Sequence, residues 1–215
     1  MSAPVRTTVH LLRHGEVHNP QGVLYGQLEG YHLSELGHQM AQAVARHLAD
    51  HDVTHVVASS LERAQETARP VAESHGLPVT TDDRVIEASN RFEGQRVASM
   101  RPTDFVHPGH WSKLTNPLRP SWGEPYAVVA RRMLAALADA RQAARGHEAV
   151  VVSHQLPIWT VRNALMGKRL WHDPRKRECR LASLTTLTYL DDELESVTYS
   201  EPAGALLVRS HGGTG

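Results

Sequence analysis

The chain has 215 residues, of which 40% are hydrophobic and 21% are charged, a globular composition that argues against wholesale disorder and predicts one domain over residues 1–215. Lys plus Arg and Asp plus Glu each number 23, so no overall positive field favours a nucleic-acid partner. No apolar run reaches the roughly 18 residues of a membrane helix, no secretory signal opens the chain, and the single cysteine excludes an intrachain disulfide. These features predict a cytoplasmic protein without a membrane partner.

The first part of the chain alternates short β-prone runs with segments in which apolar residues recur at helical spacing. Ser34 is the predicted N-cap of the first helix. In chain order we expect a strand over residues 8–12, a loop over 19–30, a helix over 34–50, a strand over 54–58, a helix over 61–76 and a short strand over 77–80.

The alternation breaks in the middle of the chain, where four prolines fall between Pro102 and Pro120. We predict that residues 93–124, approximately, form a lid-like insertion that covers part of the domain. Beyond it we expect a helix over 125–145, a strand over 149–152, a helix ending near 166, two strands over 183–190 and 194–200, and a frayed tail over about 202–215.

Strand–helix alternation predicts an α/β fold, here a three-layer sandwich whose mostly parallel central sheet is flanked by helices. Ligands of such sheets bind outside the carboxyl ends of the strands. The polar groups that come after three predicted strands are Arg13 and His14, then Ser59 to Arg63, then Ser153 and His154. Two histidines and two arginines are therefore expected around one crevice.

This set of side chains suits phosphoryl transfer. Arginine offers planar paired donors to a phosphate dianion, and a neutral imidazole is a competent nucleophile. Two arginines and a second imidazole can spread the charge that develops on the phosphoryl oxygens without a metal ion. A zinc site fits less well because no cysteine pair accompanies the histidines and nearby arginines would repel a cation. We therefore expect no metal and no cofactor.

Several motifs occur in a fixed order between about residues 8 and 165. They read LLRHGE at 11–16, LSELG at 33–37, ASSLERAQETA at 58–68, WGE at 122–124 and VVSHQ at 151–155. Together they resemble the histidine phosphatase superfamily, the phosphoglycerate-mutase-like proteins. Pro125 departs from the pattern, because serine is usual at that position.

The resemblance implies a role for each residue at the strand ends. His14 would be the nucleophile and would pass through a phosphohistidine. The residues that would hold the phosphoryl group or line the substrate side of the pocket are Arg13, Arg63, His154, Asn19 and Gln155.

The family also uses an acid, usually glutamate, to protonate the leaving oxygen. Glu87 lies where the resemblance places that acid, and we choose it. The glycine and tryptophan that commonly precede the Glu93-Gly94 pair are missing here, however, and Glu93 is the rival.

The resemblance favours a phosphatase that hydrolyses a small-molecule phosphomonoester. The alternatives are a phosphoglycerate-type mutase and a catalytically inactive binding module of the same fold. Arg96, Arg101, Lys113 and Arg119 outnumber Asp104 in the insertion, which indicates either a substrate with further negative charge or a solvated basic lid. The aromatic and cationic segment 170–177 edges the pocket or forms a dimer contact, so a homodimer stays open.

Overall fold

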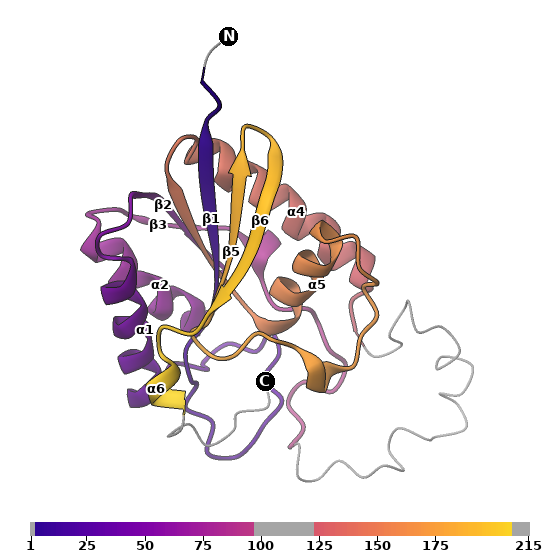
Figure 1. Ribbon diagram of the computed structural model, residues 1–215. Coiled ribbons are helices and arrows are strands. Elements are labelled where there is room, and N and C mark those ends of the chain that lie inside the picture. Colours follow the sequence, from indigo (N-terminus) through magenta and orange to yellow (C-terminus); the bar gives the residue numbers. More distant parts are fainter. Residues whose placement is uncertain (1–2, 97–122, 208–215) are drawn as a thin grey trace.

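A six-stranded sheet forms the centre of the computed structural model, which describes residues 3–96 and 123–207 (Figure 1). Its strand order is β3-β2-β4-β1-β5-β6. The pairs β1–β4, β2–β4 and β2–β3 are parallel, whereas β5 and β6 join antiparallel at one edge. The strands are β1 (Arg6–Arg13), β2 (Val53–Ala58), β3 (Val79–Thr81), β4 (Glu148–Ser153), β5 (Leu184–Leu190) and β6 (Glu193–Ser200).

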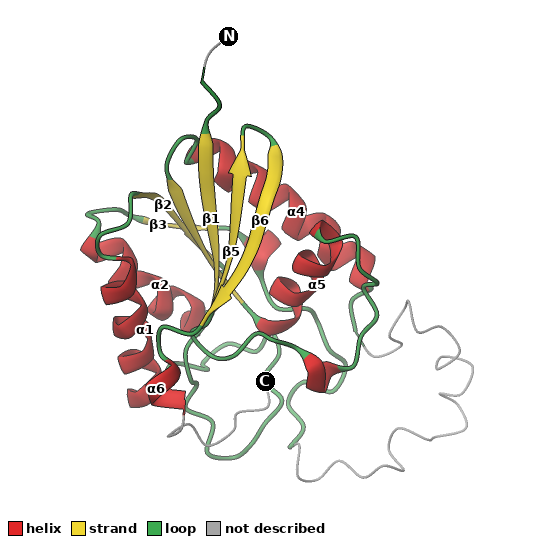
Figure 2. Ribbon diagram, in the orientation of Figure 1, coloured by secondary structure: helices red, strands yellow, loops and turns green. Residues whose placement is uncertain are grey.

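Helices cover both faces of the sheet (Figure 2), which confirms the expected three-layer α/β architecture. One face carries α1 (Glu35–Leu48) and α2 (Glu62–Ser74), and the other carries α4 (Tyr126–Ala143) and α5 (Gln155–Leu165). In β4, Val150 and Val152 pack into the core beside α1 and α2. Ala149 and Val151 point to the core beside α4 and α5. A strand buried on both faces requires the continuous apolar run that the sequence shows.

The chain after β6 differs from the expected frayed tail. Ala203 is buried and leads into a short helix, α6 (Gly204–Leu207), which contacts α1. Leu206 and Leu207 pack against the core on the α1 and α2 side, so apolar burial orders this segment. Residues 208–215, and residues 97–122 of the expected insertion, lie outside the described part of the chain. Two 3-10 turns, η1 (Asp83–Val85) and η5 (Pro174–Lys176), complete the elements described.

The pairing of β1 with β4 positions the residues just beyond them. Arg13 and Ser153 are register partners at the carboxyl ends of these strands. The His14 amide donates to the Ser153 carbonyl at 3.1 Å, which extends the pairing by one step. His14 and His154 therefore leave the sheet next to each other. The amide of Ser59, after β2, donates to the Val152 carbonyl at 3.3 Å and joins the same edge.

Within residues 3–96 and 123–207, no helix has both the length and the apolar character that crossing a bilayer requires.

Candidate active site

Two buried imidazoles lie against each other at the carboxyl ends of β1 and β4. The ring centroids of His14 and His154 are 5.1 Å apart, and the ring planes are inclined by 55°. Both side chains are almost fully excluded from solvent. The structure thus brings together the two histidines that the sequence places at separate strand ends.

The hydrogen bond of His14 fixes its tautomer. Its Nδ1 lies 2.8 Å from the carbonyl oxygen of Gly15. A carbonyl can only accept, so Nδ1 carries the proton and Nε2 keeps a free lone pair. Burial, and then the positive charges of Arg63 and Arg13, hold the pKa of His14 well below the usual value for histidine. The ring is therefore neutral at pH 7 and chemically able to act as a nucleophile through Nε2.

Close backbone contacts hold the loop that carries His14. A side chain on Gly15 would bring a β-carbon to 2.7 Å from the Gly37 carbonyl oxygen, and one on Gly37 would come to 2.0 Å from that of Glu16. The first turn of α1 therefore packs directly on this loop, and only glycine fits. Ser34 caps the helix by accepting from the Gly37 amide at 3.0 Å and donates to Glu16 at 2.6 Å.

Arg13 and Arg63 are buried beside the histidines, and each uses only part of its guanidinium. Arg13 donates from Nη1 to the Cys179 carbonyl at 2.8 Å, and Arg63 donates from Nη2 to the Gly26 carbonyl. The Nε of Arg13 and the Nε and Nη1 of Arg63 find no acceptor among the described residues. Buried donors without partners are costly, and an anion held among them would satisfy them.

His154 belongs to the same set of donors. Its Nε2 lies 2.8 Å from the hydroxyl of Ser59, whereas its Nδ1 is buried without a partner in the described part of the chain. Burial comes first among the causes that lower the pKa of His154 well below its ordinary value; repulsion between the two rings if both were protonated, and then the positive charges of Arg63 and Arg13, add to it. A neighbouring dianion would oppose this effect and favour the protonated ring.

Tyr25 contacts the site from the loop between β1 and α1. The Arg63 guanidinium carbon lies 4.7 Å from the centre of the Tyr25 ring, and the rings of Tyr25 and His14 are 6.4 Å apart. The ring thus supports the buried charge of Arg63 from one side. The sequence does not single out Tyr25, because a glycine-rich loop carries no periodic pattern that would show where its side chains point.

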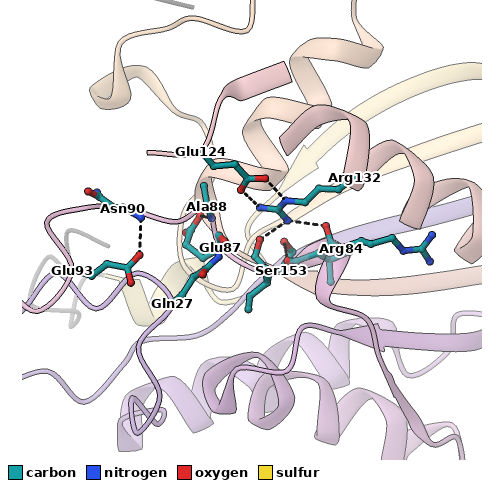
Figure 3. A network of polar contacts seen from close by, with 11 residues as sticks. Gln27, Arg84, Glu87, Ala88, Asn90, Glu93, Glu124, Arg132 and Ser153 are labelled. Carbon is teal, nitrogen blue, oxygen red and sulfur yellow. Dashed lines mark hydrogen bonds and ion pairs between the residues drawn. The ribbon is translucent and has the colours of Figure 1, made fainter. Parts of the chain in front are cut away.

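The segment that ends at Glu87 is held by side chains from three separate parts of the chain (Figure 3). Four consecutive backbone carbonyls, those of residues 84–87, each accept a side-chain hydrogen bond. The donors are Arg132 to Arg84 at 2.8 Å, Ser153 to Val85 at 2.6 Å, Arg132 to Ile86 at 2.7 Å and Gln27 to Glu87 at 2.6 Å.

Arg132 is fixed in turn by Glu124. Its Nε and Nη2 donate to the two oxygens of that carboxylate at 3.0 and 2.9 Å, a paired contact visible in Figure 3. Both side chains are largely shielded from solvent. The position of Glu87 thus depends on α4, on the end of β4 and on the loop between β1 and α1, rather than on its own neighbours in sequence.

Glu87 and Glu93 occupy different environments. Glu87 lines a cavity of about 240 Å³, and its carboxylate accepts from the Ala88 amide at 2.8 Å. Burial raises the pKa of Glu87, while that hydrogen bond and the charges of Arg177, Arg63 and Arg13 oppose the rise. Glu93 accepts from the Asn90 amide at 2.8 Å and is absent from the described lining of the cavity. Because only Glu87 of the two belongs to the described lining of the cavity, its position favours it as the proton donor. This role of Glu87 stays a prediction.

Tyr25, whose ring is near His14, and Gly26, which accepts from Arg63, also line the cavity, whereas the two histidines are absent from its described lining. Gln155 lines it, and so does Arg177, which donates to Gln155 at 3.3 Å and to His172 at 2.8 Å. The aromatic and cationic segment 170–177 thus reaches the pocket through Arg177. The lining residues are Leu24, Tyr25, Gly26, Glu87, Ala88, Ser89, Asn90, Gly123, Glu124, Tyr126, Gln155, Leu156 and Arg177.

Asn19, an expected substrate contact, is hydrogen-bonded within its own loop. Its side-chain amide donates to the Val23 carbonyl at 2.8 Å, and its carbonyl accepts from the Val23 amide at 3.0 Å. Both polar ends therefore shape the loop over residues 19–23. The expected contact of Asn19 with substrate stays a prediction.

The fold and these side chains define an α/β protein with a histidine–arginine site at the carboxyl ends of its parallel strands. The family model of the histidine phosphatase superfamily (branch 1) matches residues 9–202, so the chain belongs to that superfamily and the resemblance of its motifs is confirmed.

Two relatives illustrate its position in the superfamily. The chain is 56% identical over 202 residues to "Uncharacterized protein Rv0525" of Mycobacterium tuberculosis, covering 93% of this chain and 98% of that protein. It is 31% identical over 188 residues to "Probable phosphoglycerate mutase GpmB" of Yersinia pestis, with 84% of each chain covered.

Among solved structures, the chain is similar to mycobacterial glucosyl-3-phosphoglycerate phosphatase Rv2419c. The TM-score is 0.71 at 28% identity, covering 91% of this chain and 96% of that one. The same protein in complex with inorganic phosphate gives a TM-score of 0.66 at 26% identity, with 90% and 94% covered. The superfamily thus contains both phosphatase and mutase relatives of this chain.

Proposed function

We propose that the chain is a phosphatase that hydrolyses a small-molecule phosphomonoester through a phosphohistidine. The observation that carries this proposal is a set of buried nitrogens that have no partner in the described part of the chain, on residues next to a His14 whose Nε2 lone pair is free. Arg13, Arg63 and His154 supply these nitrogens, and a phosphoryl group has the charge and the oxygens to accept from them. The similarity to a solved phosphatase supports the same reaction class.

The proposed reaction has two steps on the same phosphorus atom. Nε2 of His14 attacks, an N–P bond forms, and the P–O bond to the leaving group breaks while Glu87 gives its proton to the leaving oxygen. In the second step the Glu87 carboxylate takes a proton from water. That water attacks phosphorus, the N–P bond breaks, and inorganic phosphate leaves with His14 neutral again.

A mutase would use the same first step and return the phosphoryl group to a bound acceptor. The 31% sequence identity to "Probable phosphoglycerate mutase GpmB" supports a mutase as the second candidate function. Trapping distinguishes the candidates: the protein is incubated with a ³²P-labelled phosphomonoester and quenched. Label that survives base but not acid marks a phosphohistidine, which we expect. Release of the label as inorganic phosphate identifies a phosphatase, transfer to an added sugar acid identifies a mutase, and an unlabelled protein contradicts both.

We expect Glu87→Gln to slow an alkyl phosphate far more than an aryl phosphate. An alkoxide is a poor leaving group that needs a proton as the bond breaks, whereas nitrophenolate leaves without one. Loss of a general acid commonly costs 10²–10⁴-fold, so we expect a decrease of about 10²-fold or more in kcat for glycerol phosphate and less than about tenfold for nitrophenyl phosphate. Steady-state kinetics with both substrates measures the contrast.

Glu93→Gln is the matched control, because it makes the same change six residues away outside the described cavity lining. It should leave the ratio of the two rates near that of the unaltered protein. If the dependence on the leaving group appears in Glu93→Gln and not in Glu87→Gln, then Glu93 is the acid.

A further inference from the structure

A second cluster of histidines lies at the other end of the sheet. Glu148 is the first residue of β4, whereas Ser153, next to His154, is its last. Five steps along a strand separate these ends by about 16 Å. At the Glu148 end lie His10, from the middle of β1, and His51, from the connection between α1 and β2. The proposed phosphoryl chemistry makes no use of this cluster.

Three atoms that can bind a metal ion converge there. Nε2 of His10 and Nδ1 of His51 lie 2.7 and 2.8 Å from the same carboxylate oxygen of Glu148. All three atoms are within 4.8 Å of one another. In a tetrahedral zinc site with bonds of 2.0–2.1 Å, the ligand atoms are separated by about 3.3 Å. The two distances from the histidine nitrogens to the Glu148 oxygen would need to widen by roughly half an ångström to match this geometry.

His10 has the outer partner that metal-binding histidines usually have. The ring is buried, and its Nδ1 lies 2.9 Å from the hydroxyl of Thr186 on β5. A hydroxyl can accept from Nδ1–H when Nε2 is the ligand, which fixes both tautomer and ring orientation. His75 fixes the turn that carries His51. Its Nε2 lies 3.1 Å from the carbonyl oxygen of Leu48 and 3.2 Å from that of His51.

We propose that His10, His51 and Glu148 form a binding site for a zinc-like divalent cation. Two imidazoles and one carboxylate suit zinc, cobalt or nickel rather than magnesium or calcium, which prefer oxygen ligands. The side chains of His51 and Glu148 are partly exposed, so an ion can enter from solvent and keep a water molecule as its fourth ligand. When the ion binds, each ligating nitrogen must be free of its proton, and a neutral ring then carries that proton on its other nitrogen.

The bound ion would join β1, β4 and the connection after α1 at the end of the sheet remote from the catalytic candidates. An ion that binds the folded chain and not the unfolded chain stabilises the fold by mass action. Its effect would therefore appear in thermal stability and metal affinity, rather than in the chemistry of phosphoryl transfer.

The test is a titration of the chelator-treated full chain with ZnCl₂ and with CoCl₂, monitored by calorimetry, melting temperature and the cobalt absorption spectrum. We expect one ion per chain, a raised Tm and a cobalt spectrum typical of mixed nitrogen and oxygen ligands. His51→Ala changes a partly exposed residue and should lower metal affinity by at least about 100-fold. Thr186→Val should lower it by about 10–100-fold, the usual effect of losing an outer partner.

Two controls test the location. His147→Ala removes an exposed histidine whose Nδ1 pairs with Asp52 at 2.6 Å outside the cluster, and it should change the affinity by less than about threefold. His14→Ala should also bind like the unaltered protein. The proposal fails if the unaltered chain does not bind zinc, if His51→Ala binds as tightly, or if His147→Ala or His14→Ala loses the ion instead.

Discussion

Replacing His14 by alanine is expected to remove turnover while leaving the fold intact. The proposed nucleophile is Nε2 of this ring, and loss of a covalent nucleophile costs several orders of magnitude, here at least about 10³-fold in kcat. The fold should persist because the hydrogen bond of the ring goes to the adjacent carbonyl of Gly15 and ties no distant element. Single-turnover and steady-state assays, together with a thermal melt, measure both effects.

His38→Ala is the matched control, since His38 is exposed on α1 and makes none of the contacts described for the site. It should keep full activity. If His14→Ala melts normally and retains more than about one per cent of turnover, His14 is not the nucleophile.

Arg63→Lys is expected to lower kcat/KM by about 10²–10³-fold although it conserves charge. The guanidinium is fully buried and donates to the Gly26 carbonyl through Nη2. Its Nε and Nη1 have no hydrogen-bond partner in the described part of the chain. Lysine carries one compact ammonium and cannot reproduce this fork. Loss of a single donor to a transition-state oxygen commonly costs this much. Inhibition by inorganic phosphate should weaken as well, because product and transition state share the donors.

Arg69→Lys tests the same exchange on the exposed side of α2 and should have no effect on kinetics. The assignment fails if the Arg63→Lys protein folds, is still inhibited by phosphate as strongly as the unaltered protein, and loses less than about threefold in kcat/KM. In that case Arg63 does not bind the phosphoryl group.

The strand-end residues could be predicted from sequence because two simple rules act there. Apolar runs reveal buried strands, and parallel strands place the residues just beyond their carboxyl ends at one edge of the sheet. Arg13, His14, Arg63 and His154 meet for this reason, although Arg63 and His154 are 91 positions apart. The helices and strands end within a few residues of their expected limits for the same reason.

Residues that reach the site from irregular segments could not be found in this way. Tyr25 depends on a loop in which Gly22 and Gly26 have φ of 60° and 40°, conformations that no periodic pattern encodes. Arg132 supports the Glu87 segment from a helix 45 positions later in the chain. The helix α6 was missed because its few apolar residues gain order only by packing on α1.

The spacing of the two imidazoles is set by the sheet itself. His14 and His154 directly succeed the paired residues Arg13 and Ser153, and their 5.1 Å separation is close to the 4.7–4.9 Å between neighbouring strands. A slip of one residue between β1 and β4 would turn one side chain to the opposite face. Pocket-lining residues outside the sheet, such as Leu24 and Ser89, take no part in this strand pairing. Exchanging them can therefore alter the shape of the pocket while the two imidazoles keep their spacing.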